Sequence, residues 1–311
     1  MEYRTLGRTG LKVSVMGWGA GGPSRLGQRH EVNTEAESVT LVQQGLDAGI
    51  NFIDTAEAYG TETIVGKAID GRDRDSLVIS TKKSSRNDGF TPDHVREGLE
   101  NSLRNLGVET IDIYHLHGVS PQHYDYCLNE TYPALVKLRE EGKIRFIGVT
   151  ETWNSDLDHQ MLRRAVADGV WDVLMVGFNI LNQSARDSVL VPSIAKDLGI
   201  LIMFAVRKAL SNPEYLKQVV GDLIASGQLD PADIDPEHPL GFLTENGGIS
   251  VPDAAYRFCR EEPGTHVILS GTGNPAHLQA NLATFERPPL PEDVTQRLQY
   301  IFRHVNSVSG E

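Results

Sequence analysis

The sequence predicts an α/β protein folded as a (β/α)8 TIM barrel, with an N-terminal β-hairpin plug and a long loop after the seventh strand. Three observations support this prediction. Eight short runs rich in Val, Ile and Phe are apolar on both faces, as in parallel strands buried between other layers. Segments with helical spacing lie between the runs, so helical crossovers join consecutive strands. The chain of 311 residues modestly exceeds the roughly 250 residues of such a barrel.

The eight predicted strands follow one another at intervals that leave room for a helix. Eight parallel strands fit a closed barrel better than an open sheet. They span residues 13–17, 51–54, 77–81, 111–117, 144–150, 173–178, 200–205 and 266–269.

The segments between the strands carry the start and stop signals of helices. Thr34 and Glu37 have the spacing of a capping box, and Gly49 ends that helix. Thr91 opens a second helix that ends at Gly107, with Leu and Val recurring every three or four residues. Two further helices end at Gly142 and at Gly169.

Two segments depart from the strand-helix repeat. Residues 3–6 and 11–13 flank a turn at 7–10 and predict a hairpin that plugs the N-terminal end of the barrel. Residues 206–250 are too long for an ordinary loop, so we expect a helix near 213–224 and a role in a lid. Because no linker or low-complexity tract divides the chain, we expect a single barrel domain over residues 1–311.

Composition narrows the classes of partner. Lys and Arg total 29 against 42 Asp and Glu, and the net charge of −13 disfavours nucleic acid and anionic membranes. The two cysteines, Cys127 and Cys259, lack metal-type spacing, which indicates a reducing compartment. The start of the chain lacks a signal-peptide pattern, and no apolar run reaches the ~18 residues of a membrane helix. We therefore expect a cytoplasmic protein with a small-molecule partner.

Polar side chains gather where the predicted strands end, which is where barrels of this class place their working residues. Asp54 and Tyr59 follow the second strand, Lys82 the third, and His117 ends the fourth. A lysine ammonium near a tyrosine favours the phenolate, and the free tyrosine pKa is about 10. A carboxylate keeps that lysine charged, and a histidine hydrogen-bonds the carbonyl oxygen that receives the proton. Together, these four side chains predict a site that transfers a proton to a carbonyl oxygen.

At these positions the sequence resembles the aldo-keto reductase family. The resemblance rests on residues 51–60, 81–82 and 112–117, and extends from residues 3–7 through 142–149 to 271–275. It implies hydride transfer between a nicotinamide cofactor and the carbonyl or alcohol carbon of an aldehyde, ketone or sugar. It also implies that Tyr59 is the general acid and base, that Lys82 and Asp54 tune it, and that His117 orients the substrate.

The chain departs from the family pattern at the cofactor. Thr150 and Glu151 stand where the family often has Ser-Asn, and Met175 stands where a glutamine is common. Residues 204–210, which include Arg207, replace the usual aromatic-Ser-Pro-Leu run, so the residue that stacks on the nicotinamide is not assigned. These differences resemble the galactose-dehydrogenase-like branch.

Residues 270–281 resemble the family's site for the adenosine phosphate, and Gly19 lies at the end of the first strand. Strict NADP(H) enzymes of the family place Lys or Arg at positions that match Gly271, Asn274 and His277, and none is cationic here. Arg207, Lys208 and Arg287 are candidates to supply charge from other loops. We expect NADP as the nominal cofactor with NAD also bound, and discrimination below about 3 kcal/mol, roughly 150-fold. The expected cofactor contacts are Gly19, Thr150, Glu151, Met175, Arg207, Gly271, Thr272, Asn274, His277 and Asn281.

The expected substrate contacts, besides Tyr59 and His117, are Trp18, Tyr124 and Trp153. Trp18 either lines the substrate mouth or only packs in the core. Tyr124 either shapes the pocket from the loop after the fourth strand or only packs that loop.

Two other motifs in the sequence are typical of different functional sites. Residues 17–22 match GxGxxG, but Pro23 follows instead of a helix with an apolar face, which argues against a Rossmann site. His115 and His117 have metal-ligand spacing without further ligands on the next strands, so we expect no metal and a hydrogen-bonded core His115. Lys83 should face opposite to Lys82. Two other functions remain open: a catalytically weak cofactor-binding redox-sensor subunit on the same barrel and, more remotely, a metal-dependent barrel hydrolase.

Overall fold

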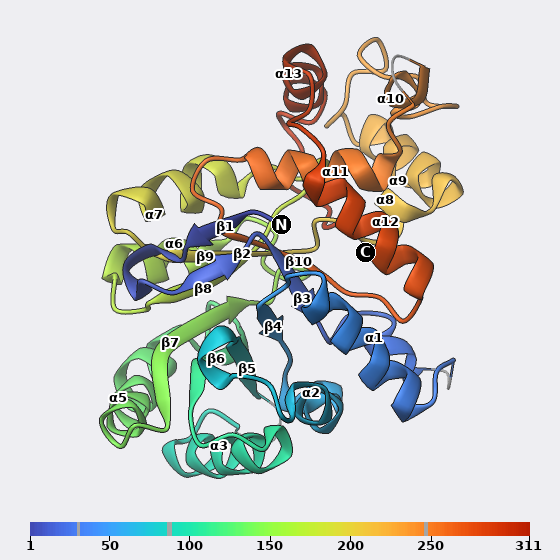
Figure 1. The fold of residues 1–311 in the computed structure, drawn as a ribbon. Coiled ribbons are helices and arrows are strands. Elements are labelled where there is room, and N and C mark those ends of the chain that lie inside the picture. The colour runs from blue at the N-terminus through green and yellow to red at the C-terminus, as the bar shows by residue number, and fades with distance from the viewer. Residues whose placement is uncertain (30–31, 86–88, 246–247) are drawn as a thin grey trace.

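Parallel strands close into a barrel in the computed structural model, which describes residues 1–29, 32–85, 89–245 and 248–311. Within those ranges eight strands follow the order β10-β3-β4-β5-β6-β7-β8-β9, with each neighbouring pair parallel. Helices surround the barrel (Figure 1). Its strands are β3 Met16–Gly19, β4 Phe52–Asp54, β5 Val78–Ser84, β6 Ile111–Val119, β7 Ile144–Glu151, β8 Val173–Gly177, β9 Gly199–Met203 and β10 Val267–Ser270.

The predicted fold class is confirmed, and seven of the predicted strands lie within one to three residues of the observed bounds. The prediction for residues 13–17 is wrong, because that run contains a break. Val13 pairs with Arg4 in a separate two-stranded sheet, and the barrel strand β3 begins only at Met16.

The N-terminal hairpin is formed by β1 Tyr3–Thr5 and β2 Lys12–Ser14, which pair antiparallel. Leu6, Leu11 and Val13 are buried in one apolar cluster with residues from the barrel interior, including Phe52 and Val78. The hairpin therefore closes the N-terminal end of the barrel, as the sequence predicts.

The predicted helix starts at Thr34 and Thr91 are confirmed, and the helices end at or within two residues of the predicted glycines. Thr34 caps α1 with the predicted capping box, and Thr91 caps α3, which ends at Gly107 in the left-handed conformation (φ 67°). The helices are α1 Glu35–Asp47, α2 Glu62–Ile69, α3 Pro92–Leu106, α4 Tyr124–Tyr126, α5 Tyr132–Glu140, α6 Gln160–Asp168, α7 Val191–Ala195, α8 Lys208–Ser211, α9 Pro213–Ala225, α10 Gly241–Glu245, α11 Val251–Glu261, α12 Pro275–Glu286 and α13 Glu292–Ile301.

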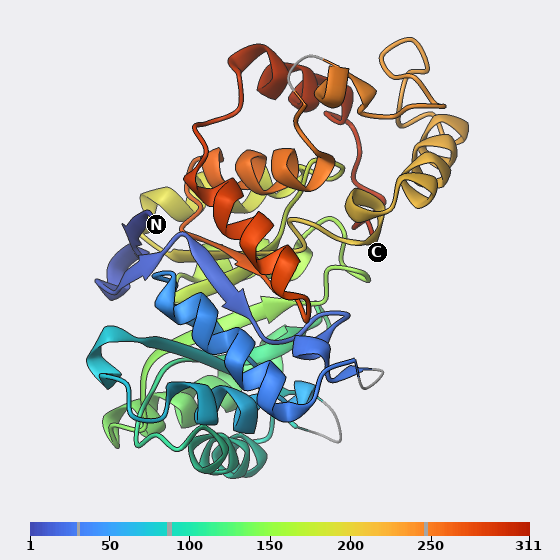
Figure 2. The same cartoon turned by 45° about the vertical axis from the view of Figure 1, so that its right-hand side comes forward.

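The long segment after β9 holds α8, α9 and α10, and the predicted helix near 213–224 is α9. Residues 246–247 of this segment lie outside the described residues. In both views α9, α10 and α13 stand beyond the ring of helices that covers the barrel wall (Figure 2). Among the described helices, none combines the length and apolar character needed to span a bilayer.

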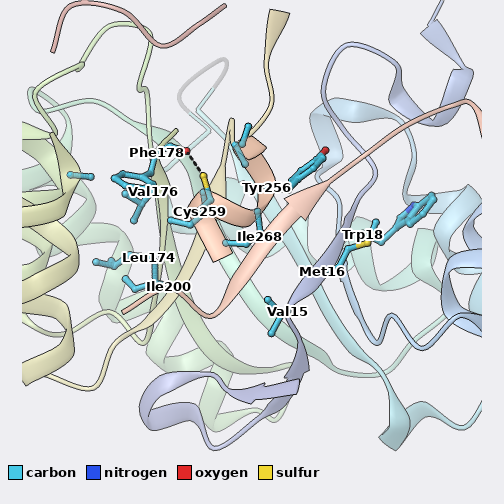
Figure 3. Packing of buried hydrophobic residues seen from close by; sticks show 14 of the residues in the cluster. Val15, Met16, Trp18, Leu174, Val176, Phe178, Ile200, Tyr256, Cys259 and Ile268 are labelled. Atoms are coloured by element: carbon cyan, nitrogen blue, oxygen red, sulfur yellow. Dashed lines mark hydrogen bonds between the residues drawn. The ribbon is translucent and has the colours of Figure 1, made fainter. Parts of the chain in front are cut away.

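The main core lies between the barrel wall and the helices (Figure 3). Phe178 at the end of β8 packs face to face with Phe258 of α11, with ring centroids 5.9 Å apart. The buried Cys259 thiol lies 3.5 Å from the Phe178 carbonyl oxygen. Cys127 is also buried, and both cysteines are free thiols.

Candidate active site

A cavity of about 560 Å³ opens at the C-terminal ends of the barrel strands. The predicted site residues that line it are Gly19, Asp54, Tyr59, His117, Thr150, Glu151, Trp153, Met175, Arg207 and Gly271. A larger cavity of about 860 Å³ lies at the opposite end, near the starts of β5 and β6, and contains none of the predicted site residues. The cavity at the C-terminal strand ends is therefore the candidate active site.

Lys82 and Asp54 form a buried ion pair in the barrel interior. Lys82 Nζ donates to Asp54 Oδ2 at 2.5 Å and to the Thr55 carbonyl oxygen at 2.7 Å, and Ser80 Oγ donates to Asp54 Oδ1 at 2.8 Å. The Lys82 side chain is 0% exposed. Burial acts to lower the pKa of Lys82, but Asp54 and Tyr59 outweigh it and raise the pKa. Burial raises the pKa of Asp54 against the opposing effect of Lys82. The lysine is thus held as a cation.

Tyr59 stands on a single helical turn, Glu57–Tyr59, just after β4. Its hydroxyl lies 3.3 Å from His117 Nε2, and Lys82 Nζ lies 5.0 Å from the centroid of its ring. Burial raises the pKa of Tyr59, and the lowering effect of Lys82 only partly offsets it. The sequence shows the lysine but not the burial that opposes its effect on the tyrosine pKa. In the structure the net direction is upward, so Tyr59 is protonated at neutral pH and able to donate.

Gly21 makes room for the Tyr59 ring. A Cβ on Gly21 would lie 2.4 Å from Tyr59 Cε2, closer than real contacts allow. Gly271 likewise lets the segment after β10 approach β3, because a Cβ on Gly271 would lie 2.2 Å from the Gly19 carbonyl oxygen. Sequence reasoning missed the dependence of Tyr59 on Gly21, although the glycine run was the available signal.

His115 and Lys83 show how strand alternation sorts neighbouring side chains. His115 pairs with Lys82 across β5 and β6, and its ring packs against Gly148 inside the barrel. Neither of its ring nitrogens has a hydrogen-bond partner among the described residues, so the expectation of a hydrogen-bonded His115 is wrong. Burial, then the charge of Lys82, holds its pKa well below the ordinary value. Lys83 points to the outer side and pairs with Glu57 at 2.9 Å, which confirms its predicted direction. Among the described ranges, no group of three or more His, Cys, Asp or Glu could hold a metal ion.

The Thr150 and Glu151 side chains are engaged within the protein. Thr150 Oγ1 accepts from the Gly118 N–H at 2.7 Å. The Glu151 carboxylate lies 2.9 Å from His159 Nδ1 and accepts from the Gly177 N–H at 2.7 Å. Burial raises the pKa of Glu151, and His159 opposes that effect. Glu151 therefore ties the ends of β7 and β8 together, a role that sequence reasoning missed because His159 sits in a left-handed turn (φ 57°).

Two aromatic rings form one wall of the cavity. Phe204 directly follows β9 with φ 66°, and its ring centroid lies 5.6 Å from that of Trp153. The Arg207 guanidinium lies 3.8 Å from the Phe204 centroid, and its Nε lies 2.5 Å from Glu311 Oε2. Phe204 thus places an aromatic ring in the cavity lining, and Arg207 covers one of its faces.

The expectations for Trp18 and Tyr124 as substrate residues are wrong. Trp18 alternates with interior glycines in β3, so its side chain points outward. Trp18 is 1% exposed, and its indole packs against Gly45 of α1. Tyr124 is buried behind the barrel wall, where its hydroxyl donates to Asp168 at 2.7 Å and accepts from the Trp171 N–H at 3.1 Å. Both residues pack rather than line the cavity.

Of residues 271–274, which join β10 to α12, Gly271 alone lines the cavity. The Asn274 side chain caps α12 by accepting from the Ala276 N–H at 2.9 Å, and Asn281 Nδ2 donates to Ser270 Oγ at 2.9 Å. The expected cofactor residues outside the cavity lining are Thr272, Asn274, His277 and Asn281. Two lining residues that sequence reasoning missed are Arg25 and Arg29, from the loop after β3.

Comparisons with known proteins agree with this geometry. The model of the Aldo/keto reductase family matches residues 20–302. The chain is 38% identical to an L-galactose dehydrogenase of Arabidopsis thaliana over 157 residues, which is 48% of each protein. It is 25% identical to a D-threo-aldose 1-dehydrogenase of a Pseudomonas species over 303 residues, covering 88% of this chain and 89% of that one. It is 32% identical to an NADH-specific methylglyoxal reductase of Escherichia coli strain K12 over 228 residues, covering 65% and 66%.

Solved structures show the same fold. The holo form of an aldo-keto reductase from Bacillus halodurans superimposes with a TM-score of 0.72 at 22% identity, covering 97% of this chain and 96% of that one. A thermostable aldo-keto reductase in complex with the inhibitor epalrestat gives 0.74 at 24% identity, covering 97% and 100%. At these identities the likeness concerns the fold alone.

Proposed function

Because this chain belongs to the aldo/keto reductase family, we propose that it transfers a hydride between a nicotinamide cofactor and the carbonyl or alcohol carbon of an aldehyde, ketone or sugar. The observation that carries the proposal is the meeting of Tyr59, His117 and the Lys82–Asp54 pair at one end of the barrel, with the Tyr59 hydroxyl 3.3 Å from His117 Nε2. These groups supply a proton donor, a second hydrogen-bonding group and a fixed cation.

Each of these residues has a separate role in carbonyl reduction. Tyr59 donates its hydroxyl proton to the carbonyl oxygen as that oxygen gains negative charge, and it takes the proton back from the alcohol in oxidation. Lys82 stabilises the phenolate that this transfer leaves, and Asp54 keeps Lys82 in place. His117 hydrogen-bonds the same substrate oxygen and so orients the carbonyl. A bound nicotinamide would supply or accept the hydride.

The cavity fits a nicotinamide dinucleotide. Met175, Met203, Leu269 and Phe204 give its lining an apolar part that suits a flat ring. Cationic side chains stand at the same cavity, which suits phosphate groups. We propose NADP as the main cofactor. NAD should also be accepted, because Gly271, Asn274 and His277 stand where strict NADP(H) enzymes of the family place a cation.

The substrate we favour is a sugar or another polyhydroxylated carbonyl compound. Thr152, Asn154 and Ser155 line the cavity from the loop after β7 and offer hydroxyl and amide groups. Thr152 Oγ1 is itself buried and has no hydrogen-bond partner among the residues that the structure describes. Two of the similar proteins carry the names of sugar dehydrogenases.

The test is an absorbance assay of the reduced nicotinamide, with both cofactors and a panel of aldehydes, ketones and sugars. We expect turnover with both cofactors and the highest kcat/KM on a sugar. Tight cofactor binding with negligible turnover over the whole panel would favour a redox-sensor subunit instead. Loss of activity to chelators, together with stoichiometric zinc, would favour a metal-dependent hydrolase.

A further inference from the structure

Two arginines of the loop between β3 and α1 line the cavity, and neither pairs with an acidic side chain among the residues that the structure describes. Arg25 and Arg29 both belong to the cavity lining. Within the described ranges, neither side chain forms an ion pair or a hydrogen bond. We call these two residues the arginine rim. Two guanidinium groups at one cavity, with no partner among the described residues, suit an anionic ligand, because their planar donors match carboxylate or phosphate oxygens.

The charges of the cavity support this reading. Each acidic side chain of the lining already has a partner: Asp54 and Glu311 form ion pairs with Lys82 and Arg207, and Glu151 contacts the His159 ring. The arginine rim therefore adds positive charge that nothing in the described lining neutralises. The whole chain has a net charge of −13, so this opening is a local positive site on an acidic protein. Such a field attracts an anionic ligand to the cavity.

The loop that carries the arginine rim is joined to the segment that leads into α12. Asn33 Nδ2 donates to the Gly273 carbonyl oxygen at 2.7 Å and to the Leu26 carbonyl oxygen at 3.0 Å. A Cβ on Gly273 would lie 2.5 Å from Gly27, so the two backbones touch. The rim is thus held next to the N-terminus of α12, a helix of 12 residues whose dipole also favours negative charge at that end.

The backbone of the rim is strained. Arg25 has φ 45° and Leu26 has φ 59°, values that residues with a Cβ rarely adopt. Strain of this kind persists where the surrounding structure holds it, and it is concentrated at ligand sites. Here it occurs in the turn that holds Arg25 at the cavity.

We propose that Arg25 and Arg29 bind a phosphate group of the nicotinamide cofactor, so that the loop after β3 supplies the charge that α12 lacks. The proposal rests on the proposed function. A guanidinium group matches two phosphate oxygens at once, which makes arginine the preferred partner of phosphate. Two sources share this chemistry: the 2′-phosphate, present only in NADP(H), and the pyrophosphate, present in both cofactors.

The test is calorimetric titration of the full chain with NADPH, NADH, 2′,5′-ADP and 5′-ADP. The variants are Arg25→Ala, Arg29→Ala and the double variant, with Arg25→Lys and Arg29→Lys as charge-conserving versions. The control is Arg72→Ala, which removes the same charge at the opposite end of the barrel. We expect each alanine variant to weaken phosphate binding about tenfold. The lysine variants should lose only a few-fold, and Arg72→Ala should lose nothing. Thermal melting of each variant checks that it folds.

The four ligands separate the two phosphate sources. Losses confined to NADPH and 2′,5′-ADP place the rim at the 2′-phosphate, and losses shared by NADPH, NADH and 5′-ADP place it at the pyrophosphate, which 2′,5′-ADP lacks. Either result supports the proposal. Unchanged binding of all four ligands to the folded double variant overturns it while leaving the proposed function intact. A wild-type chain that binds none of the four ligands overturns both.

Discussion

The hydroxyl of Tyr59 and Nε2 of His117 lie 3.3 Å apart, although the two residues stand 58 positions apart in the chain. Their rings meet edge to face at 89°, with centroids 5.3 Å apart. Tyr59 comes from the turn after β4 and His117 from β6, on either side of β5, which carries Lys82. The barrel thus brings side chains from three neighbouring strand ends, β4, β5 and β6, close together.

Replacing Lys82 with methionine should cut kcat by at least 100-fold, since the cation that stabilises the phenolate is lost. The pH at which the oxidation rate levels off should also rise, for the same reason. Lys83→Met is the matched control. Lys83 follows Lys82 on β5 but points to the outer side of the barrel, where it pairs with Glu57. Steady-state kinetics across pH decide the matter, and the opposite ranking of the two variants would refute the assignment.

Gly21→Ala should displace the Tyr59 ring, because the new Cβ would lie 2.4 Å from Cε2 of that ring. We expect kcat to fall by roughly 10- to 100-fold, since displacements of about 1 Å have costs of that order. Gly221→Ala is the control, because a Cβ there meets nothing within 4 Å. If kcat with Gly21→Ala matched the wild type, Tyr59 would not depend on this packing.

His115 should make the fold sensitive to acid. Its pKa is held well below the ordinary value, so its contribution to stability is fully present above about pH 6.5 and is lost as the pH falls. We expect the free energy of unfolding of the wild type to fall more steeply from pH 7 to pH 5 than that of His115→Leu. The difference should approach about 1.4 kcal/mol per pH unit. Urea titrations of both proteins measure it, and parallel pH profiles would rule the effect out.

His277→Arg should shift the cofactor preference toward NADPH. His277 is exposed in the first turn of α12, where an arginine could reach a 2′-phosphate. We expect the ratio of kcat/KM for NADPH over NADH to rise about tenfold. No change in this ratio would mean that the phosphate does not bind at this helix start.

The barrel and the positions of the chemical groups were predictable because both follow local patterns. The apolar runs mark the strands, and Asp54, Lys82 and His117 come at strand ends, which a parallel barrel must bring together. Trp18 could also have been placed, because Gly17 and Gly19 on either side of it leave Trp18 on the outer face of β3.

Other features depend on tertiary structure and had no local signal. The raised pKa of Tyr59 comes from burial that outweighs Lys82, and a sequence does not give burial at a cavity. His159 reaches Glu151 only through a left-handed turn. Arg25 and Arg29 reach the cavity because their loop touches the segment before α12, a contact between residues about 240 positions apart.

Tyr59→Phe with chemistry shown to be rate-limiting is the most direct test of the account, because it removes one hydroxyl and little packing. If Tyr59 supplies the proton to the carbonyl oxygen, kcat should fall about 100- to 10,000-fold. The melting temperature should remain close to that of the wild type. A variant that keeps more than about a tenth of the wild-type kcat would contradict the assignment of Tyr59 as the general acid.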